Sequence, residues 1–233
     1  MSASLPDVLV WTRMQAEAGQ GLERIVARKE RERRLNGGTF LWGVGSAPAR
    51  AVRSFAMTGT PLPVVFSTML SKPKASDSAP EAIVAWTRIV GADGVARPLP
   101  EASIVTSRHT GRATHYALHC RCDAPLSLGD IGRFDPTAYR NHGDAGGPVG
   151  ASQVTSLLKR HGQDGETPAY AIAMTATLVE GMWTRLTDPV HVPADLRSSL
   201  DEEHDDASWL LLSARIRLGT PAAVGDQADL FSL

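Results

Sequence analysis

Short apolar runs rich in β-branched and aromatic residues recur along this chain of 233 residues. Runs of this length and composition predict strands, and the alternation over residues 115–122 is the clearest example. Polar turns such as the one at residues 91–94 separate the runs. We expect strands at 8–14, 39–45, 62–70, 82–90, 103–107, 115–122, 169–179, 182–186 and 208–218.

Four other segments have the spacing or the end signals of helices. Leu22, Ile25 and Val26 lie on one face of a helix over residues 22–35, which Asn36, Gly37 and Gly38 end. Ser46 and Pro48 begin a second helix, which Gly59 stops. We expect two further helices at 152–161 and 193–200, and a polar loop at 72–80.

Many strands with a few helices between them predict an α+β fold with a strongly bent or barrel-like mixed sheet. We expect residues 1–218 to form one domain and residues 219–233 to form a flexible tail. The chain is 42% hydrophobic and 21% charged, its net charge is −1, and no apolar run reaches the length of a membrane span. With only two cysteines and no secretory signal, the sequence predicts a cytoplasmic protein, with association with the nucleoid left open.

Near its end the tail carries an apolar pair, Leu230 and Phe231, within a polar segment. A stretch of small residues at 219–225, without a helical or strand period, separates this pair from the domain. Leu230 and Phe231 are therefore either exposed and able to bind a partner, or packed back onto the domain. The pentapeptide over residues 227–231 resembles the motif Gln-Leu-Ser/Asp-Leu-Phe, by which many bacterial replication and repair proteins bind the sliding clamp. Ala228 stands where leucine is usual. The resemblance implies that the clamp is a partner, contacted through Gln227, Asp229, Leu230 and Phe231.

The triplet Trp-Thr-Arg occurs three times, at residues 11–13, 86–88 and 183–185, each time in an expected strand. Residues two apart on a strand share a face, so each tryptophan lies beside its arginine. Such a pair can stack a nucleobase and contact its phosphate. Alternatively, the arginine stem covers apolar surface on an ordinary sheet face. The candidates for nucleic-acid contact are Trp11, Arg13, Trp86 and Arg88.

The order of elements over residues 8–120 resembles the PUA-like superfamily, which includes the EVE, ASCH and YTH domains. The segments that carry the resemblance are 8–14, 39–45 with the helix that follows, 64–67 and 82–86. Domains of this kind hold a flipped, modified base in an aromatic cage. The resemblance implies Trp11, Trp42 and Trp86 as cage walls, whereas a place in the core is the alternative for each.

The helix over residues 22–35 is the most basic segment of the chain. It holds six basic and three acidic residues, so its surplus of three positive charges suffices for a few phosphate contacts. The alternative is a solvated face with ion pairs along the helix. From this helix we take Arg24, Arg28 and Arg31 as candidates for nucleic-acid contact.

No combination of residues in the sequence predicts catalysis, a cofactor or a metal. His115 and His119 fall on one face of their strand while Cys120 and Cys122 fall on the other, so the four cannot converge on one ion. We expect both cysteines to act as small buried apolar residues. The sequence therefore favours a DNA-associated protein held at the clamp by its tail. The alternatives are an enzyme or small-molecule-binding domain with an accidental tail match, and a clamp regulator without DNA contact.

Overall fold

The computed structural model describes residues 5–16, 20–44, 62–69, 83–91, 93–107, 115–129, 131–142, 147–149, 155–162, 170–202 and 205–218. Its elements in chain order are β1 (Val8–Arg13), α1 (Leu22–Leu35), β2 (Thr39–Val44), β3 (Pro63–Met69), β4 (Val84–Val90), β5 (Ala96–Pro98), β6 (Val105–Ser107), β7 (His115–Arg121), β8 (Gly132–Phe134), a 3₁₀ turn η1 (Pro136–Ala138), β9 (Tyr139–Asn141), β10 (Thr155–Arg160), β11 (Tyr170–His191), α3 (Ala194–Asp201) and α4 (Asp206–Leu218).

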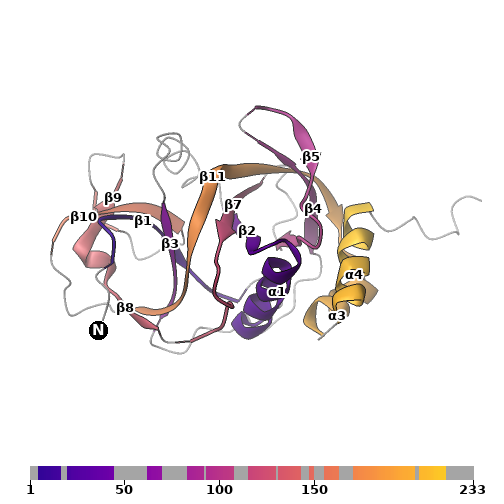
Figure 1. Ribbon diagram of the computed structural model, residues 1–233, viewed down its shortest axis with the longest axis horizontal. Helices are drawn as coiled ribbons and strands as arrows, with labels where there is room; N and C mark the ends of the chain where they lie inside the picture. Colours follow the sequence, from indigo (N-terminus) through magenta and orange to yellow (C-terminus); the bar gives the residue numbers. More distant parts are fainter. Residues whose placement is uncertain are drawn as a thin grey trace, which may run out of the picture.

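The long strand β11 is the centre of an eleven-stranded sheet. Its N-terminal part pairs with β3 and β8, and its C-terminal part pairs with β7 and β4, always antiparallel. Figure 1 shows β11 crossing the molecule from the end that holds β8 toward the end that holds the helices. One strand therefore joins the two ends of the fold.

The sheet is mixed, because β1 and β3 run parallel while β1 and β10 run antiparallel. The strand order β2-β7-β11-β3-β1-β10-β9 does not close on itself among the described residues. The predicted α+β fold with a large mixed sheet is thus confirmed. Closure into a barrel is not seen in the described part of the chain, and the relation to PUA-like domains stays a prediction.

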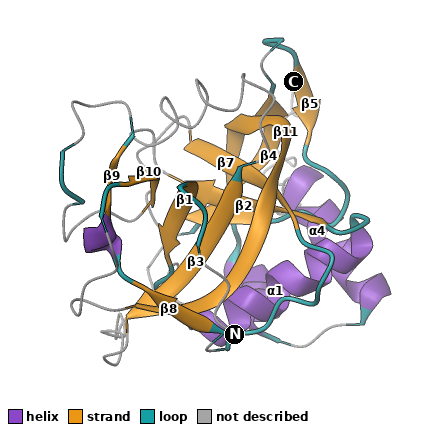
Figure 2. Ribbon diagram, turned by 60° about the vertical axis from the view of Figure 1, so that its left-hand side comes forward, coloured by secondary structure: helices purple, strands orange, loops and turns teal. Residues whose placement is uncertain are grey.

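The α-helices of the described ranges, α1, α3 and α4, gather at one end of the sheet (Figures 1 and 2). The face of α1 that carries Val26 packs on a core cluster that includes Phe40 of β2 and Phe66 of β3. A second cluster unites α3 and α4 with the start of β4, and Trp209 is its largest member. None of the helices in the described ranges is long and apolar enough to cross a membrane.

Most of the predicted elements up to residue 122 lie where the sequence placed them. α1 has the predicted bounds, and β1, β2, β3, β4, β6 and β7 fall within the predicted strands. α3 also agrees with the helix expected at 193–200. The short strands β5, β8 and β9 were not predicted. The helix expected after Gly45, the polar loop at 72–80 and the tail at 219–233 lie outside the described residues.

The helix predicted at 152–161 is wrong, because β10 occupies this segment and pairs antiparallel with β1. Leu157 belongs to the central core cluster, whereas Leu158 belongs to the cluster on the opposite face of the sheet. Adjacent buried residues of this kind suit a strand that is covered on both faces, since successive side chains point to opposite sides. A short apolar run does not distinguish this arrangement from a helix.

The strand predicted at 208–218 is also wrong, because this segment forms the helix α4. Trp209, Leu212 and Ile216 are buried together, at the spacing of one helical face. The predicted strands at 169–179 and 182–186 form the single strand β11, whose pairing with β7 shifts register between Leu178 and Trp183. An interruption in the apolar pattern therefore marks an irregularity within one strand.

Candidate nucleic-acid interface

Two of the tryptophans predicted to contact nucleic acid are core residues. Trp11 is 1% exposed, its Nε1 donates to Ser67 Oγ over 2.7 Å, and its ring packs against Phe134 and Tyr170. Trp86 is also 1% exposed and stacks on the ring of His115. Neither ring presents a face at the surface of this structure. Both side chains occupy the place that the core alternative assigned to them.

The three predicted cage walls lie in different parts of the core. Trp11 belongs to the cluster at the β8–β10 end, and Trp86 belongs to the cluster between β4 and β7. Trp42 is half-buried and meets the ring of Phe66 edge-on in the central cluster. The structure does not bring the three indoles together around one space.

The arginines of the triplets are more exposed than the tryptophans Trp11 and Trp86. Arg13 is half-buried at the end of β1. Arg88 is exposed, and its Nε lies 3.6 Å from Asp188 Oδ2. In the third triplet, Arg185 is exposed and the side chain of Trp183 is not among those described. Trp86 and Arg88 share a strand face, yet only the arginine reaches solvent.

The basic helix α1 is less basic at its surface than its sequence suggests. Arg28 is 7% exposed and donates from Nη1 to Ile104 O and from Nη2 to Gln20 Oε1, each over 2.9 Å. Lys29 is also buried and donates to Glu32 Oε2 over 2.7 Å and to Ile104 O over 2.8 Å. The placement of Arg28 on an exposed basic face was wrong, because its guanidinium holds α1 against the segment before β6.

Burial changes the protonation of the groups around this helix. Removal from water lowers the pKa of Lys29 to about 8, although the neighbouring Glu32 carboxylate acts in the opposite direction. Burial likewise raises the pKa of the Cys120 thiol and lowers the pKa of His119. Groups with shifted pKa values occur at active sites, but Lys29 and Cys120 are buried and have no access to solvent here. We interpret them as structural.

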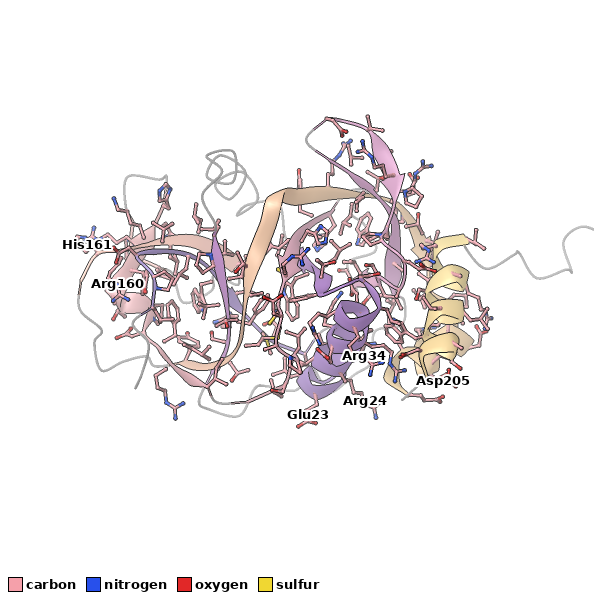
Figure 3. The ribbon with its side chains drawn as sticks, in the orientation of Figure 1. Glu23, Arg24, Arg34, Arg160, His161 and Asp205 are labelled. Atoms are coloured by element: carbon pink, nitrogen blue, oxygen red, sulfur yellow. The ribbon has the colours of Figure 1, made fainter. Side chains whose placement is uncertain are left out.

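Two further cations of α1 meet an acidic and an aromatic group of α4, and Arg33 pairs with Glu30 of α1 itself. Arg34 forms a salt bridge with Asp206, and the guanidinium of Arg31 lies 5.8 Å from the centre of the Trp209 ring. Figure 3 shows Arg34 on the side of α1 that faces the start of α4, where Asp205 is labelled, and Arg24 near Glu23. The surface of α1 therefore offers few cations to phosphate.

The structure instead groups basic side chains at the far end of the molecule. A surface depression of about 360 Å³ is lined by Asp7, Lys159, Arg160, His161 and Gly162. Figure 3 shows Arg160 and His161 at the end opposite to α1. We call Lys159, Arg160 and Arg140 the β10 cation group, which His161 adjoins. The sequence signal was the basic run at 159–161, which the incorrect helix assignment concealed.

Arg160 anchors this group to the fold. Its Nη2 donates to Leu5 O and to Tyr139 Oη over 2.8 Å each, and its guanidinium lies 4.9 Å from the centre of the Tyr139 ring. Lys159 is exposed and lies directly opposite Arg140, which is also exposed, in the antiparallel pair of β10 and β9. Like charges directly opposite each other on neighbouring strands are unfavourable for sheet pairing.

Within the described residues, no group of three or more histidine, cysteine or acidic side chains is arranged to hold a metal ion. Cys120 and Cys122 are free thiols. Comparison of the chain with protein-family models, with curated proteins and with solved structures finds no match.

Proposed function

We propose that this protein is a DNA-associated protein that its tail holds at the bacterial sliding clamp. The observation that carries the proposal is the segment Gln227-Ala228-Asp229-Leu230-Phe231, which follows the last helix of the domain. The motif it resembles combines a polar glutamine with an apolar pair, so that a hydrogen-bonding group and two apolar side chains fill one groove.

The position of the motif relative to α4 suits a tether. Helix α4 ends at Leu218, and the eight residues 219–226 separate it from Gln227. A segment of this length reaches about 26–29 Å when extended. The motif can therefore enter a groove on a partner without requiring α4 to contact that partner.

The β10 cation group supplies the DNA contact in this proposal. Lys159, Arg140 and Arg160 lie together at one end of the fold, where Arg160 pairs with Asp7, whereas in α1 Arg34 pairs with Asp206 and Arg28 is buried. Clustered cations of this kind can contact the phosphates of a strand. The chain as a whole has a net charge of −1, so such a contact is weak on its own. A tether raises the effective concentration of the domain at DNA, and a weak contact then suffices.

The clamp interaction is tested with a fluorescent peptide of residues 219–233 and purified bacterial sliding clamp. We expect anisotropy to report binding at about micromolar strength. The double variant Leu230→Ala, Phe231→Ala removes both apolar side chains, and its peptide should not bind. The matched control is Ser232→Ala, outside the pentapeptide, which should bind like the wild type. No binding by the wild-type peptide would refute clamp tethering.

The DNA contact is tested separately on the whole chain with single-stranded and duplex DNA at several salt concentrations. Each phosphate contact adds about 0.9 to the slope of log affinity against log salt for duplex DNA. Lys159→Ala and Arg140→Ala should each weaken binding and lower that slope by about one. Arg13→Ala, Arg88→Ala and Arg24→Ala test the positions predicted from the sequence.

The outcomes of these two experiments distinguish the alternatives. Clamp binding without measurable DNA binding identifies a clamp regulator. DNA binding that depends on Arg13 or Arg88, and not on Lys159, places the contact at the triplets. Loss of clamp binding altogether leaves an enzyme or a small-molecule-binding domain, and the tail match is then accidental.

A further inference from the structure

Helix α4 has an apolar face on each side. Its inner face carries Trp209, Leu212 and Ile216, all buried in the cluster shared with α3 and β4. Its opposite face carries Ala207, Leu211, Ala214 and Leu218, which we call the outer stripe. Residues at this spacing lie on one line along a helix. The helix is thus apolar on the face it buries and on the face it turns outward.

The outer stripe is exposed. Leu211 is 63% exposed and Leu218 is 87% exposed, and both are among the five large apolar side chains exposed in the described part of the chain. Figure 1 shows α4 at the edge of the molecule, on the side away from the sheet. Single exposed leucines need no explanation, but two of them in one line with alanines form a continuous apolar surface on a helix.

The outer stripe is complementary to a second copy of itself. Its four positions are symmetric about the point midway between Leu212 and Ser213. When two copies of α4 pack antiparallel around that point, Leu211 lies opposite the second copy's Ala214, and Ala207 lies opposite the second copy's Leu218. Each leucine then meets an alanine, which lets the two helices approach closely and interdigitate.

The charges at the two ends of α4 support the same antiparallel arrangement. Asp206 stands in the first turn, and Arg215 and Arg217 stand in the last turn. Asp206 pairs with Arg34 and Arg215 pairs with Asp195 within the chain, but both pairs stay about half exposed. Antiparallel packing brings the acidic first turn of one copy next to the basic last turn of the other, and it also opposes the two helix dipoles. Parallel packing would place like charges together at both ends.

We propose that the outer stripe binds a second copy of this chain, so that the protein forms a dimer through antiparallel α4 helices. Thirteen residues of helix span about 20 Å, so the contact is a small one. A contact of this size gives a reversible dimer whose population depends on concentration. The proposal does not depend on clamp or DNA binding.

The oligomeric state of the full chain is the first test, measured by sedimentation equilibrium over a range of concentrations. Leu211→Glu places a charge at the centre of the stripe and should raise the dimer dissociation constant at least about tenfold. Ile131→Glu is the matched control, because Ile131 is 61% exposed and lies outside α4. It should dimerise like the wild type, and circular dichroism checks that both variants are folded.

The register is tested by disulfide formation between two differently tagged chains that carry Cys122→Ser. A chain with Leu211→Cys should cross-link to a chain with Ala214→Cys, because these positions face each other. A chain with Ala207→Cys should cross-link to the Ala214→Cys chain at least about fivefold less, because the two positions lie one helical turn apart across the interface. Equal cross-linking in both mixtures would overturn the antiparallel register.

Two results would overturn the dimer. One is a monomeric full chain at all concentrations, with or without the Leu211→Glu change. The other is a monomeric full chain that dimerises only when residues 219–233 are removed, since the chain's own tail then covers the stripe. A dimer that Leu211→Glu leaves intact would place the interface elsewhere and would also refute the proposal.

Discussion

Glu32 joins three parts of the molecule through one carboxylate. Its Oε1 accepts from the backbone nitrogen of Leu41 in β2 over 2.7 Å, and its Oε2 accepts from Lys29 Nζ. Lys29 in turn donates to Ile104 O in the segment before β6. The side chain of Glu32 is completely buried. A charge in such a place is tolerated only because both oxygens have strong partners.

Changing Glu32 to glutamine should destabilise the fold strongly. Glutamine keeps the size of the side chain and one acceptor oxygen, but it removes the negative charge that balances buried Lys29. We expect the free energy of unfolding to fall by about 3 kcal/mol, measured by urea denaturation. The control is Glu23→Gln in the exposed first turn of the same helix, with a change of about 0.5 kcal/mol or less. A loss under about 1 kcal/mol for Glu32→Gln would contradict this role.

Lys29 should make the stability of the protein depend on pH in the alkaline range. Its pKa is about 8 in the folded chain, against the ordinary lysine value of 10.5, so the unfolded chain binds more protons between these values. Stability therefore rises with pH in that window, as the cost of burying the ammonium group disappears. We compare the free energy of unfolding of the wild type with that of the Lys29→Met variant at each pH. From pH 8 to pH 10.5 this difference should change by up to about 3 kcal/mol in favour of the wild type.

The comparison with Lys29→Met is needed because Cys120 has the opposite effect on how the free energy of unfolding changes with pH. Its raised pKa means that the folded chain holds the thiol proton more tightly, so this group lowers stability as pH rises above 9.0. Both proteins contain Cys120, and its contribution largely cancels in the difference. If the difference in free energy of unfolding between the two proteins does not change from pH 8 to pH 10.5, the lowered pKa of Lys29 is contradicted.

The elements that could be predicted from the sequence are those with one apolar face and clear ends. α1 is an example, since its apolar spacing and the residues Asn36-Gly37-Gly38 determine both its type and its end. β10 and α4 are apolar on two faces, so the period that separates strand from helix is missing. Their structure depends on neighbours distant in sequence: β1 pairs with β10, and Ala102 accepts from Trp209 in α4.

The candidate site was harder to predict than the fold. Alternation shows which residues share a face of a strand, but it does not show which positions on that face other elements bury. Trp86 and Arg88 share a face, and only packing against β6 and β7 buries the first and leaves the second in solvent. Arg28 lies three residues after Ile25, beside the apolar face of α1, and its charge alone suggested exposure; its guanidinium meets the carbonyl of Ile104 from a distant segment. The Lys159–Arg140 pair depends on the pairing of β10 with β9, which the sequence pattern does not encode locally.

The two faces of α4 should respond very differently to truncation. Trp209 is 2% exposed and its Nε1 donates to Ala102 O over 3.1 Å, so Trp209→Ala should lower the free energy of unfolding by about 3–5 kcal/mol. Leu211→Ala on the outer stripe, in chain dilute enough to be monomeric, should change it by about 0.5 kcal/mol or less. Thermal or urea unfolding distinguishes the two. Similar losses from both would contradict the orientation of α4.

The two proposed contact surfaces lie at opposite ends of the molecule. The β10 cation group is at one end, and α4, from which the tail continues, is at the other (Figures 1 and 3). The strand β11 spans the distance between them and pairs with strands at both ends. A chain bound to a second copy by α4 would therefore keep its cation group at the end far from that contact.

Dimerisation should strengthen attachment to the clamp without any new contact. A dimer carries two tails, so on a surface densely coated with clamp the second tail binds intramolecularly, and such linkage raises apparent affinity by about 10²–10⁴. We expect the wild-type chain to dissociate from such a surface at least about tenfold more slowly than the Leu211→Glu chain. On a surface with sparse clamp the two should dissociate alike, because each tail then binds alone. Equal rates on the dense surface would mean that the two tails of a dimer do not bind clamp together.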